Sequence, residues 1–239
     1  MKSLRKKFKF LSLLLALALP SFSLLGDLSN GLVAWYPFDG NASDMSGNGN
    51  DLTLHGNPTL IPSNIGGGIR FDGQDDYAVR ARLLSSNTPF TWSFWIQENE
   101  NGVVMCQGHS SAVSPSVELS QANFKLYTYT SVEHSLTLPT SYSNQSEWRH
   151  YVAIRDNDGV KRLYQNGKYL GESDNTSAFG QNCSFFYVGG NIGYNSFTKM
   201  DLKKIRVYNR ALSAEEVSSV YRLESPNHFA EMNSSVDMK

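Results

Sequence analysis

The sequence predicts an all-β fold, a two-sheet antiparallel sandwich with one short C-terminal helix. Short segments in which apolar and polar residues alternate dominate the chain, and this period of two puts successive side chains on opposite faces of a strand. Clusters of Gly, Asn, Ser and Pro separate the segments, as turns do. Strands this numerous, without helical periods between them, indicate two packed sheets.

Two alternating segments, 90–96 and 148–155, give the strongest strand signals. We expect Trp92 and Trp148 in the core, because each starts or continues an alternating apolar face. His150 is expected there too, as a core side chain satisfied by a hydrogen bond. Further strands are expected around residues 32–38, 68–71, 76–80, 102–106, 117–119, 124–129, 184–188 and 202–208.

Turn and cap signals predict one hairpin and the helix. Asn166 and Gly167 stand between two strand-like runs, where a two-residue turn needs positive φ at both positions. Ser213 is expected to cap a helix over residues 214–222, with Glu216 completing a capping box. We expect this helix to pack beside the last strand.

The N-terminal segment has the layout of a cleavable secretory signal. Five basic residues precede an apolar run from Phe10 to Leu19, which Pro20 and small residues follow. This run of roughly 10 residues is shorter than the roughly 20 that a bilayer needs. We therefore expect a signal peptide over residues 1–23, a secreted protein that is extracellular or periplasmic, and no membrane insertion after cleavage.

The rest of the chain is expected to form one domain, over residues 24–223. About 200 residues suit one large all-β domain better than two small ones. Residues 224–239 have little apolar content and no period, so they cannot offset their own ordering entropy. We expect them to form a disordered tail.

Charge disfavours two classes of partner. The predicted signal holds five of the 21 Lys and Arg residues and none of the 22 Asp and Glu residues, so the remaining chain carries a formal net charge near −6. Binding to nucleic acid or to anionic membranes through bulk charge is therefore disfavoured.

The chain has two cysteines, Cys106 and Cys183. In an exported protein a single disulfide between them is the default expectation. Two buried thiols on different strands would give the same sequence pattern, so both alternatives stay open.

Several segments, in the same order, resemble those of bacterial LamG-like domains of the laminin G and concanavalin A-like lectin/glucanase superfamily. The closing run from Ile205 to Val217 is the most specific of them. The others are residues 31–40, 44–51, 71–77, 90–96, 148–153 and 187–191. The resemblance implies a jelly-roll sandwich of two curved sheets, with one concave face and loops at its rims. It implies a fold more firmly than a function, because lectins, adhesion modules and glycosidases share this superfamily.

The acidic, Asn-rich loop near the N-terminus is the candidate metal site. Calcium takes roughly six to eight oxygen ligands and prefers carboxylates and carbonyls on irregular loops. Many LamG-like relatives hold a structural calcium near their N-terminal loop. The resemblance therefore implies that Asp39, Asp44 and Asn48 bind a Ca²⁺ ion.

Turn chemistry is the alternative, because Asp and Asn side chains also bond nearby backbone groups. Lys203 and Lys204 stand where relatives often carry acidic residues, which weakens the metal interpretation. Asp72, Asp75 and Asp76 form a second acidic cluster, which we interpret as a hairpin turn rather than a ligand set.

Four tyrosines are the candidate glycan-binding residues. The apolar face of a sugar stacks on an exposed aromatic ring while Asn, Asp and Arg side chains bond its hydroxyls. Tyr127, Tyr129, Tyr142 and Tyr194 lie in or beside polar, loop-rich segments. The alternative for each is an ordinary place on a strand face.

Catalytic patterns are weak in this sequence. Glycan hydrolysis needs two carboxylates that flank the scissile bond, and the Glu-x-Asp-x-x-Glu run of glycosidases on this sandwich is missing. Glu98 and Glu100 share a face but stand in a loop-like segment, while Glu215 and Glu216 belong to the helix cap.

The sequence therefore favours a secreted, non-catalytic recognition module that binds a glycan or an extracellular protein partner. A glycan-degrading hydrolase on the same fold and a structural or adhesive surface component are the alternatives. Two carboxylates facing each other in a deep groove would favour the hydrolase. A shallow surface lined by aromatic side chains would favour glycan binding.

Overall fold

The computed structural model describes residues 28–62, 67–97, 100–109, 112–120, 123–129, 133–139, 147–173 and 183–225. The predicted signal peptide lies outside these residues, and so does the predicted tail beyond Ser225. Among the residues described, no helix has the length and apolar character that crossing a membrane requires.

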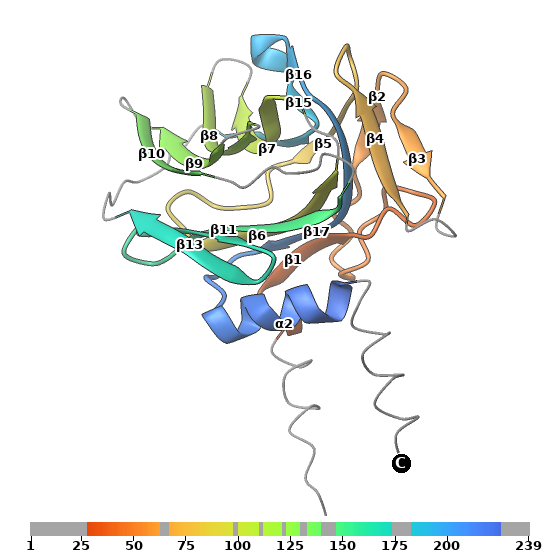
Figure 1. Ribbon diagram of the computed structural model, residues 1–239. Helices are drawn as coiled ribbons and strands as arrows, with labels where there is room; N and C mark the ends of the chain where they lie inside the picture. The colour runs from red at the N-terminus through yellow and green to blue at the C-terminus, as the bar shows by residue number, and fades with distance from the viewer. Residues whose placement is uncertain are drawn as a thin grey trace, which may run out of the picture.

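Two antiparallel sheets form the predicted sandwich (Figure 1). The sheet that we call helix-backed contains β1 (Leu32–Tyr36), β3 (Thr59–Ile61), β4 (Gly68–Asp72), β6 (Phe90–Gln97), β11 (Arg149–Arg155), β12 (Lys161–Gln165), β13 (Lys168–Ser173) and β17 (Lys199–Tyr208). The sheet that we call open contains β2 (Thr53–His55), β5 (Tyr77–Ala81), β7 (Gly102–His109), β8 (Ala112–Leu119), β9 (Asn123–Tyr129), β10 (Glu133–Pro139) and β14 (Phe185–Val188). The all-β, two-sheet jelly-roll prediction is confirmed.

Strand order explains how distant segments become neighbours. The helix-backed sheet runs β13-β12-β11-β6-β17-β4-β3, with β1 also paired to β17, and the open sheet runs β10-β9-β8-β7-β14-β5-β2. A short hairpin of β15 (Gly190–Asn191) and β16 (Ser196–Phe197), joined by the 3₁₀ turn η2 (Ile192–Tyr194), lies beside β7 of the open sheet (Figure 1).

The core lies between the two sheets. Trp92 of β6 packs edge-on against Phe186 of β14, with ring centroids 5.7 Å apart. Phe94 of β6 meets Phe124 of β9 in the same way, at 6.3 Å, and all four side chains are fully buried. Burying an aromatic side chain of this kind contributes about 1.5–3 kcal/mol. The alternation in residues 90–96 therefore determines which face of β6 points inward, and the core prediction for Trp92 is confirmed.

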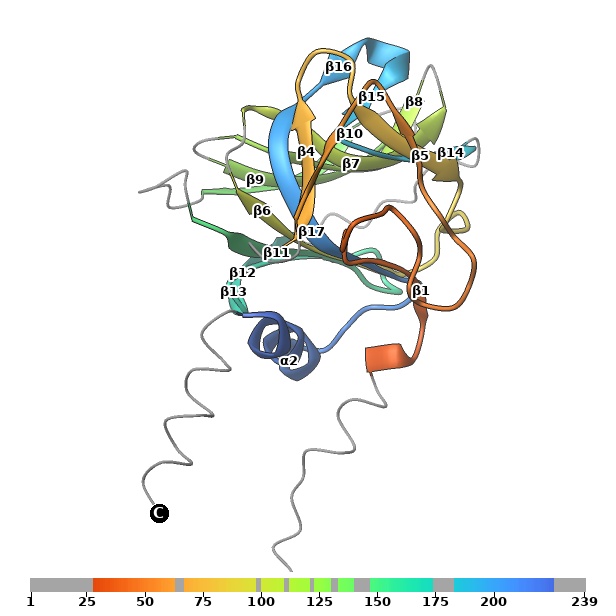
Figure 2. The same cartoon turned by 90° about the vertical axis from the view of Figure 1, so that its right-hand side faces the viewer.

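Helix α2 (Ala214–Glu224) covers the outer side of the helix-backed sheet, as Figures 1 and 2 both show. Val217 and Val220 of the helix share a buried apolar cluster with Val152 and Ile154 of β11. Since the alternate residues of β11 point into the main core, this strand is buried along its whole length on both faces.

Side-chain hydrogen bonds hold both ends of α2. At its start the predicted capping box is present, because Ser213 Oγ accepts from the Glu216 N–H at 3.3 Å and the Glu216 carboxylate accepts from the Ser213 N–H at 2.8 Å. At its end Glu224 is buried and accepts from Trp95 Nε1 at 2.8 Å and Arg206 Nε at 2.7 Å. The predicted start of the tail is therefore wrong at Glu224, whose carboxylate joins the helix to the sheet.

Two predictions near the start of β11 have opposite outcomes. His150 is fully buried, and its Nε2 lies 2.7 Å from Ser93 Oγ, so the predicted core hydrogen bond is confirmed. Trp148 is only half-buried and lies beneath Lys203, whose Nζ is 4.0 Å from the ring centroid. The core prediction for Trp148 is wrong because β11 begins one residue later, at Arg149, and the alternation of side chains does not reveal where a strand begins.

The predicted two-residue hairpin joins β12 to β13. Asn166 and Gly167 have φ values of 49° and 74°, as a turn with positive φ at both positions requires. A Cβ atom on Gly167 would lie 3.0 Å from Cδ1 of Tyr221 in α2. Glycine thus allows both the turn and the close approach of the helix.

Candidate functional site

The Asp44 carboxylate organises the acidic loop near the N-terminus. It accepts hydrogen bonds from the backbone N–H groups of Trp35, Ser46 and Asn50 and from the Ser46 hydroxyl, at 2.8–2.9 Å. Burial acts to raise the pKa of Asp44, but these donors outweigh it and hold that pKa below its ordinary value. The geometry is that of turn chemistry, the alternative to a metal site.

The other predicted ligands lie around the same loop. The Asn48 amide donates to the carbonyls of Leu32 and Val33, at 2.9 and 3.2 Å, and Asp39 is exposed. Arg80 reaches into the loop, where its guanidinium donates to the Asn50 side chain. Calcium binding by Asp39, Asp44 and Asn48 stays a prediction.

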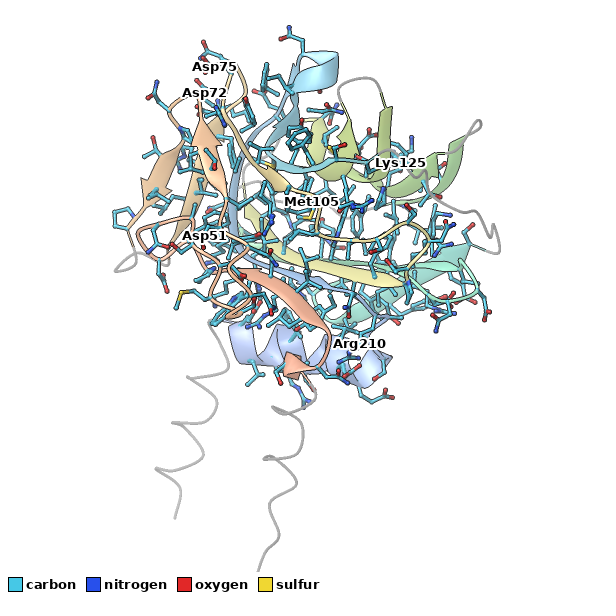
Figure 3. The ribbon with its side chains drawn as sticks, turned by 180° about the vertical axis from the view of Figure 1, so that it is seen from behind. Asp51, Asp72, Asp75, Met105, Lys125 and Arg210 are labelled. Atoms are coloured by element: carbon cyan, nitrogen blue, oxygen red, sulfur yellow. The ribbon has the colours of Figure 1, made fainter. Side chains whose placement is uncertain are left out.

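The second acidic cluster lies at the turn between β4 and β5 (Figure 3). Oxygen atoms of Asp72, Asp75 and Asp76 all lie within 4.8 Å of one another. Asp76 is buried and accepts from the backbone N–H groups of Asn57 and Asp72, at 2.6 and 3.0 Å. Asp72 accepts from the Gln74 N–H at 2.8 Å. These bonds agree with the interpretation of the cluster as a turn.

The outer face of the open sheet brings together residues from seven strands. Strand register places one row of residues across all seven strands on this face: Thr53, Val79, Tyr187, Cys106, Ser116, Tyr127 and Ser135. Glu118, Lys125 and Thr137 form the next row along β8, β9 and β10. Because side chains two residues apart on a strand share a face, both rows belong to one face of the sheet. In its middle Tyr187, Cys106, Ser116 and Tyr127 are buried, so the groups that it presents to solvent lie toward its two ends.

Aromatic rings line one end of this surface. His55 stacks on Tyr77, with centroids 4.6 Å apart and planes within 5° of each other. Tyr77 lies 6.3 Å from Tyr187, which lies 6.0 Å from Phe185. Tyr187 is buried, whereas Phe185 is 42% exposed and His55 is also exposed. We call these four residues the aromatic row; its two ends present rings to solvent.

A polar pocket of about 230 Å³ lies at the other end of the surface, where β7, β8, β9 and β10 meet. Glu118 and Lys125 line it as an ion pair, with their nearest oxygen and nitrogen 3.9 Å apart. The Lys125 Nζ also lies 4.8 Å from the centroid of the Tyr127 ring. The rest of the lining consists of Asn101, Gly102, Leu119, Ser120, Asn123 and Thr137. Figure 3 shows Lys125 on the opposite side of the molecule from Asp72 and Asp75.

The structure brings one of the four predicted tyrosines into this surface. Tyr127 is 9% exposed, and burial raises the pKa of its hydroxyl above the ordinary value. Tyr129 ends β9 and Tyr194 lies in η2, but their side chains are outside the described part of the chain, and so is the whole of Tyr142. Glycan binding by these four tyrosines stays a prediction.

Most residues of this surface were not predicted from the sequence. His55, Tyr77, Phe185 and Tyr187 are far apart in the chain and meet only through strand pairing. The only local pattern was the alternation of apolar and polar residues along each strand. This pattern predicts which side chains face outward, but it does not predict which strand pairs with which.

The predicted disulfide is not formed in the structure. Cys106 and Cys183 are both buried and carry thiols. The pKa of the Cys106 thiol is raised, mainly by burial and to a smaller extent by the nearby Cys183 and Glu118. A buried thiol with a raised pKa behaves as a small apolar side chain, which was the alternative that the sequence left open.

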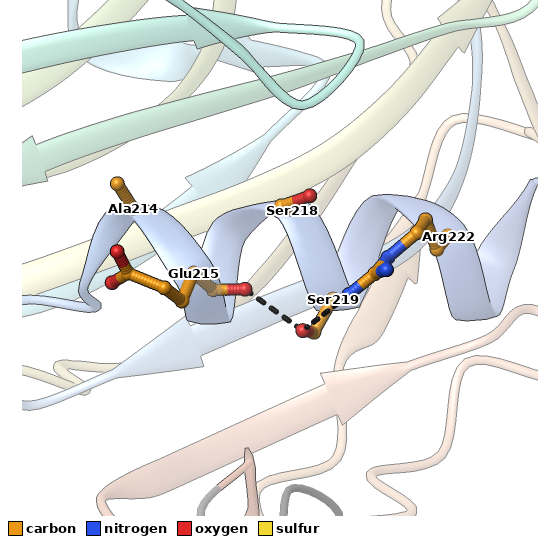
Figure 4. A pocket seen from close by; sticks show the side chains of 5 residues that line it. All are labelled: Ala214, Glu215, Ser218, Ser219 and Arg222. Carbon is orange, nitrogen blue, oxygen red and sulfur yellow. Dashed lines mark hydrogen bonds between the residues drawn. The ribbon is translucent and has the colours of Figure 1, made fainter. Parts of the chain in front are cut away.

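A second hollow, of about 370 Å³, lies along α2 (Figure 4). The side chains that line it belong to the helix itself. Ser219 Oγ donates to the Glu215 carbonyl at 2.8 Å and accepts from Arg222 at 3.4 Å. These bonds stay within one helix surface, so the hollow offers no convergent set of groups from different elements.

Three of the solved structures that resemble this chain are compared with it. Domain 4 of AbnA, an extracellular arabinanase of Geobacillus stearothermophilus solved with arabinotriose, has a TM-score of 0.64 and 21% identity, covering 80% of this chain and 98% of that domain. The binding domain of Paraclostridial Mosquitocidal Protein 1 has a TM-score of 0.67 and 18% identity, with coverage of 82% and 53%. For botulinum neurotoxin type C the TM-score is 0.69, the identity is 10% and the coverage is 84% and 53%.

The chain thus spans about half the length of the two toxin structures and nearly all of the arabinanase domain. No curated protein matches it. A family model matches residues 71–218, more than half of the chain, from the end of β4 into α2. With this match and the two-sheet jelly-roll described above, the chain belongs to the concanavalin A-like lectin/glucanase superfamily.

Proposed function

We propose that the protein is a non-catalytic module that binds a glycan on the outer face of the open sheet. The observation that carries this proposal is the strand register, which assembles the aromatic row and the polar pocket on one surface. Sugars have apolar ring faces that stack on aromatic side chains and hydroxyls that bond polar groups. The surface offers both kinds of group.

The similar structures support the same class of ligand. The arabinanase domain, which matches this chain over nearly its whole length, was solved with arabinotriose bound. Entry of botulinum neurotoxin type C into cells depends on two ganglioside molecules. We extend the ligand class from these proteins to this chain, but not the individual ligands, because the identities are low.

The arrangement of carboxylates supports a role without catalysis. Glu118 and Glu133 lie on the strands of the open sheet, on β8 and β10. Register puts them two strands and four residues apart, which corresponds to roughly 16 Å at ordinary strand spacings. Glycoside hydrolysis uses carboxyl groups about 5–9.5 Å apart. Among the described strand residues of the open sheet, these two carboxylates are therefore too far apart to act as a pair of catalytic acids.

We also propose that the protein acts outside the cytoplasm. The basic and apolar pattern of residues 1–23 supports export. Mass spectrometry of the protein recovered from its host tests this: an N-terminus near residue 24 is expected, and an intact N-terminus would contradict it.

A glycan array probed with the full chain tests the binding proposal. Glycans that bind are then titrated calorimetrically against the wild type, Phe185→Ala and His55→Ala. We expect each substitution to weaken binding about five- to tenfold, the equivalent of about 1–1.4 kcal/mol of lost ring stacking.

Tyr169→Ala is the matched control, because Tyr169 is 52% exposed but belongs to β13 of the helix-backed sheet. Binding that is weakened equally by Tyr169→Ala, or left unchanged by the other two substitutions, would overturn the placement of the site. Release of reducing sugar from a bound glycan would show instead that the protein is a hydrolase.

A further inference from the structure

We infer that the polar pocket is a subsite that selects an uncharged sugar, so that the ligand is a neutral oligosaccharide. This inference rests on the proposed function and adds the ligand's charge and minimum length. It follows from the charges, the size and the position of the pocket.

Among the described residues that line the pocket, one carries a carboxylate, one carries an ammonium group and no other side chain is charged. Glu118 and Lys125 are paired at 3.9 Å, with side chains 34% and 25% exposed. A partly exposed pair at this distance is weak, and each group has several donor or acceptor positions, so each can bond a ligand in addition to its partners in the protein. A hydroxyl of a sugar can donate to the carboxylate while its neighbour accepts from the ammonium.

Charge balance makes the pocket unfavourable for charged sugars. Because Glu118 and Lys125 are only 3.9 Å apart, a uronic acid that paired with Lys125 would also bring its carboxylate close to Glu118. An amino sugar that paired with Glu118 would likewise bring its ammonium close to Lys125. Like charges brought together in a binding site lower the affinity. A neutral sugar meets neither repulsion and can use both groups.

The size and position of the pocket set the length of the ligand. A volume of about 230 Å³ is below the roughly 300–1,000 Å³ of sites for larger ligands, so the pocket suits one sugar ring. Tyr127, which borders Lys125, is separated from Tyr187 of the aromatic row by three strand spacings, or roughly 14 Å. Contact with both ends of the surface therefore requires an oligosaccharide.

The experiment measures the affinity of the full chain for three kinds of trisaccharide at low salt. Arabinotriose, xylotriose and cellotriose are the neutral probes; galacturonic acid and glucosamine trisaccharides are the acidic and basic probes. We expect the wild type to bind at least one neutral probe about tenfold more tightly than either charged probe, and more tightly than the corresponding monosaccharide.

Glu118→Gln and Lys125→Gln form a matched pair of variants. Each removes one charge from the pocket and keeps a polar side chain of similar length. Glu118→Gln should weaken binding of the neutral trisaccharides severalfold. It should strengthen binding of the galacturonic acid trisaccharide, because no carboxylate then balances the charge of Lys125. Lys125→Gln should strengthen binding of the glucosamine probe for the converse reason. A simple loss of structure would not produce these opposite changes.

Several outcomes overturn the inference. If the wild type binds the charged probes as tightly as the neutral ones, the pocket does not select uncharged sugars. If Phe185→Ala no longer binds the neutral trisaccharides but both pocket variants bind them as tightly as the wild type, the pocket is not part of the site. The aromatic row is then the glycan site. Failure of the wild type to bind any probe or any array glycan overturns the proposed function as well. Thermal unfolding of each variant, expected within about 2 °C of the wild type for a weak surface pair, confirms folding.

Discussion

At the scale of single residues, the same side chains serve as turn formers and as candidate ligands. Asp44 was predicted as a calcium ligand from its type and its loop, and the structure shows its carboxylate surrounded by four hydrogen-bond donors. Buried acceptors satisfied in this way stabilise a loop without any ion. The role of Asp44 in the stability of the fold is therefore testable by itself.

Asp44→Asn should lower the free energy of unfolding at pH 7 by about 1–3 kcal/mol, because an amide NH₂ would face N–H and O–H donors. The pKa of Asp44 is lower in the folded state than its ordinary value of 3.8. Its carboxylate thus adds stability that is present above about pH 4 and is lost as the pH falls through the folded-state pKa. The difference between wild type and variant should shrink below that pH.

Urea unfolding at a series of pH values measures this difference. Asp158→Asn, at an exposed turn residue, controls for the removal of one surface charge. A difference between wild type and Asp44→Asn that stays constant from neutral to acidic pH would contradict the prediction.

At the scale of elements, α2 is joined to the sandwich at several points along its length. Glu224 bonds Trp95 and Arg206, and Tyr221 stacks on Trp95 with centroids 5.7 Å apart. Tyr221 also packs against the β12–β13 turn at Gly167. The turn and the helix should therefore be coupled energetically.

Gly167→Ala tests this coupling, and Gly47→Ala is its matched control. Both glycines have positive φ, 74° and 88°, so either alanine incurs about 1–2 kcal/mol of backbone strain. Only the alanine at 167 would also meet Tyr221, at 3.0 Å; nothing lies within 4 Å at position 47. We expect Gly167→Ala to lose about 1 kcal/mol more than Gly47→Ala in denaturant unfolding. Equal losses would mean that Tyr221 moves aside without cost.

The sequence predicted which strands, turns and helix are present better than it predicted the residues at which they begin and end. Alternation found β6 and β11, and positive-φ residues found the β12–β13 turn. The strand β10 was not predicted, although Leu136 and Leu138 alternate with Ser135 and Thr137, because its Ser, Thr and Pro content also suits a loop. The prediction that Trp148 lies in the core was wrong for a related reason, because the alternation of side chains does not show at which residue a strand begins.

At the scale of the whole molecule, the candidate site could not be read from the sequence. His55 and Phe185 lie 130 positions apart and are connected by the rings of Tyr77 and Tyr187, through the pairing of β2, β5 and β14. Such pairings depend on the topology of the complete sandwich. A period of two specifies which way a side chain points on its own strand, but leaves the neighbouring strand undetermined.

Calcium binding is also a property of the whole fold, because a ligand that binds only the folded state raises the melting temperature. A calcium ion held by Asp39, Asp44 and Asn48 predicts that a chelator lowers the melting temperature by several degrees. Added calcium should restore it, and the chelator should have no effect on Asp44→Ala. An identical melting temperature with calcium and with chelator would contradict the prediction and leave hydrogen bonds as the sole support of the loop.

The position of the two chain ends has a consequence for how the module can be attached. Leu28 packs in the same cluster as Val217 and Val220 of α2, and Ser225 directly follows that helix. Leu28 and Ser225, the first and last residues that the structure describes, therefore lie on the side of the helix-backed sheet, across the sandwich from the open sheet (Figures 1 and 2). A neighbouring domain or a surface joined at either end would hold the proposed glycan face pointing away from itself. Tethering would thus orient this face toward the surroundings without blocking it.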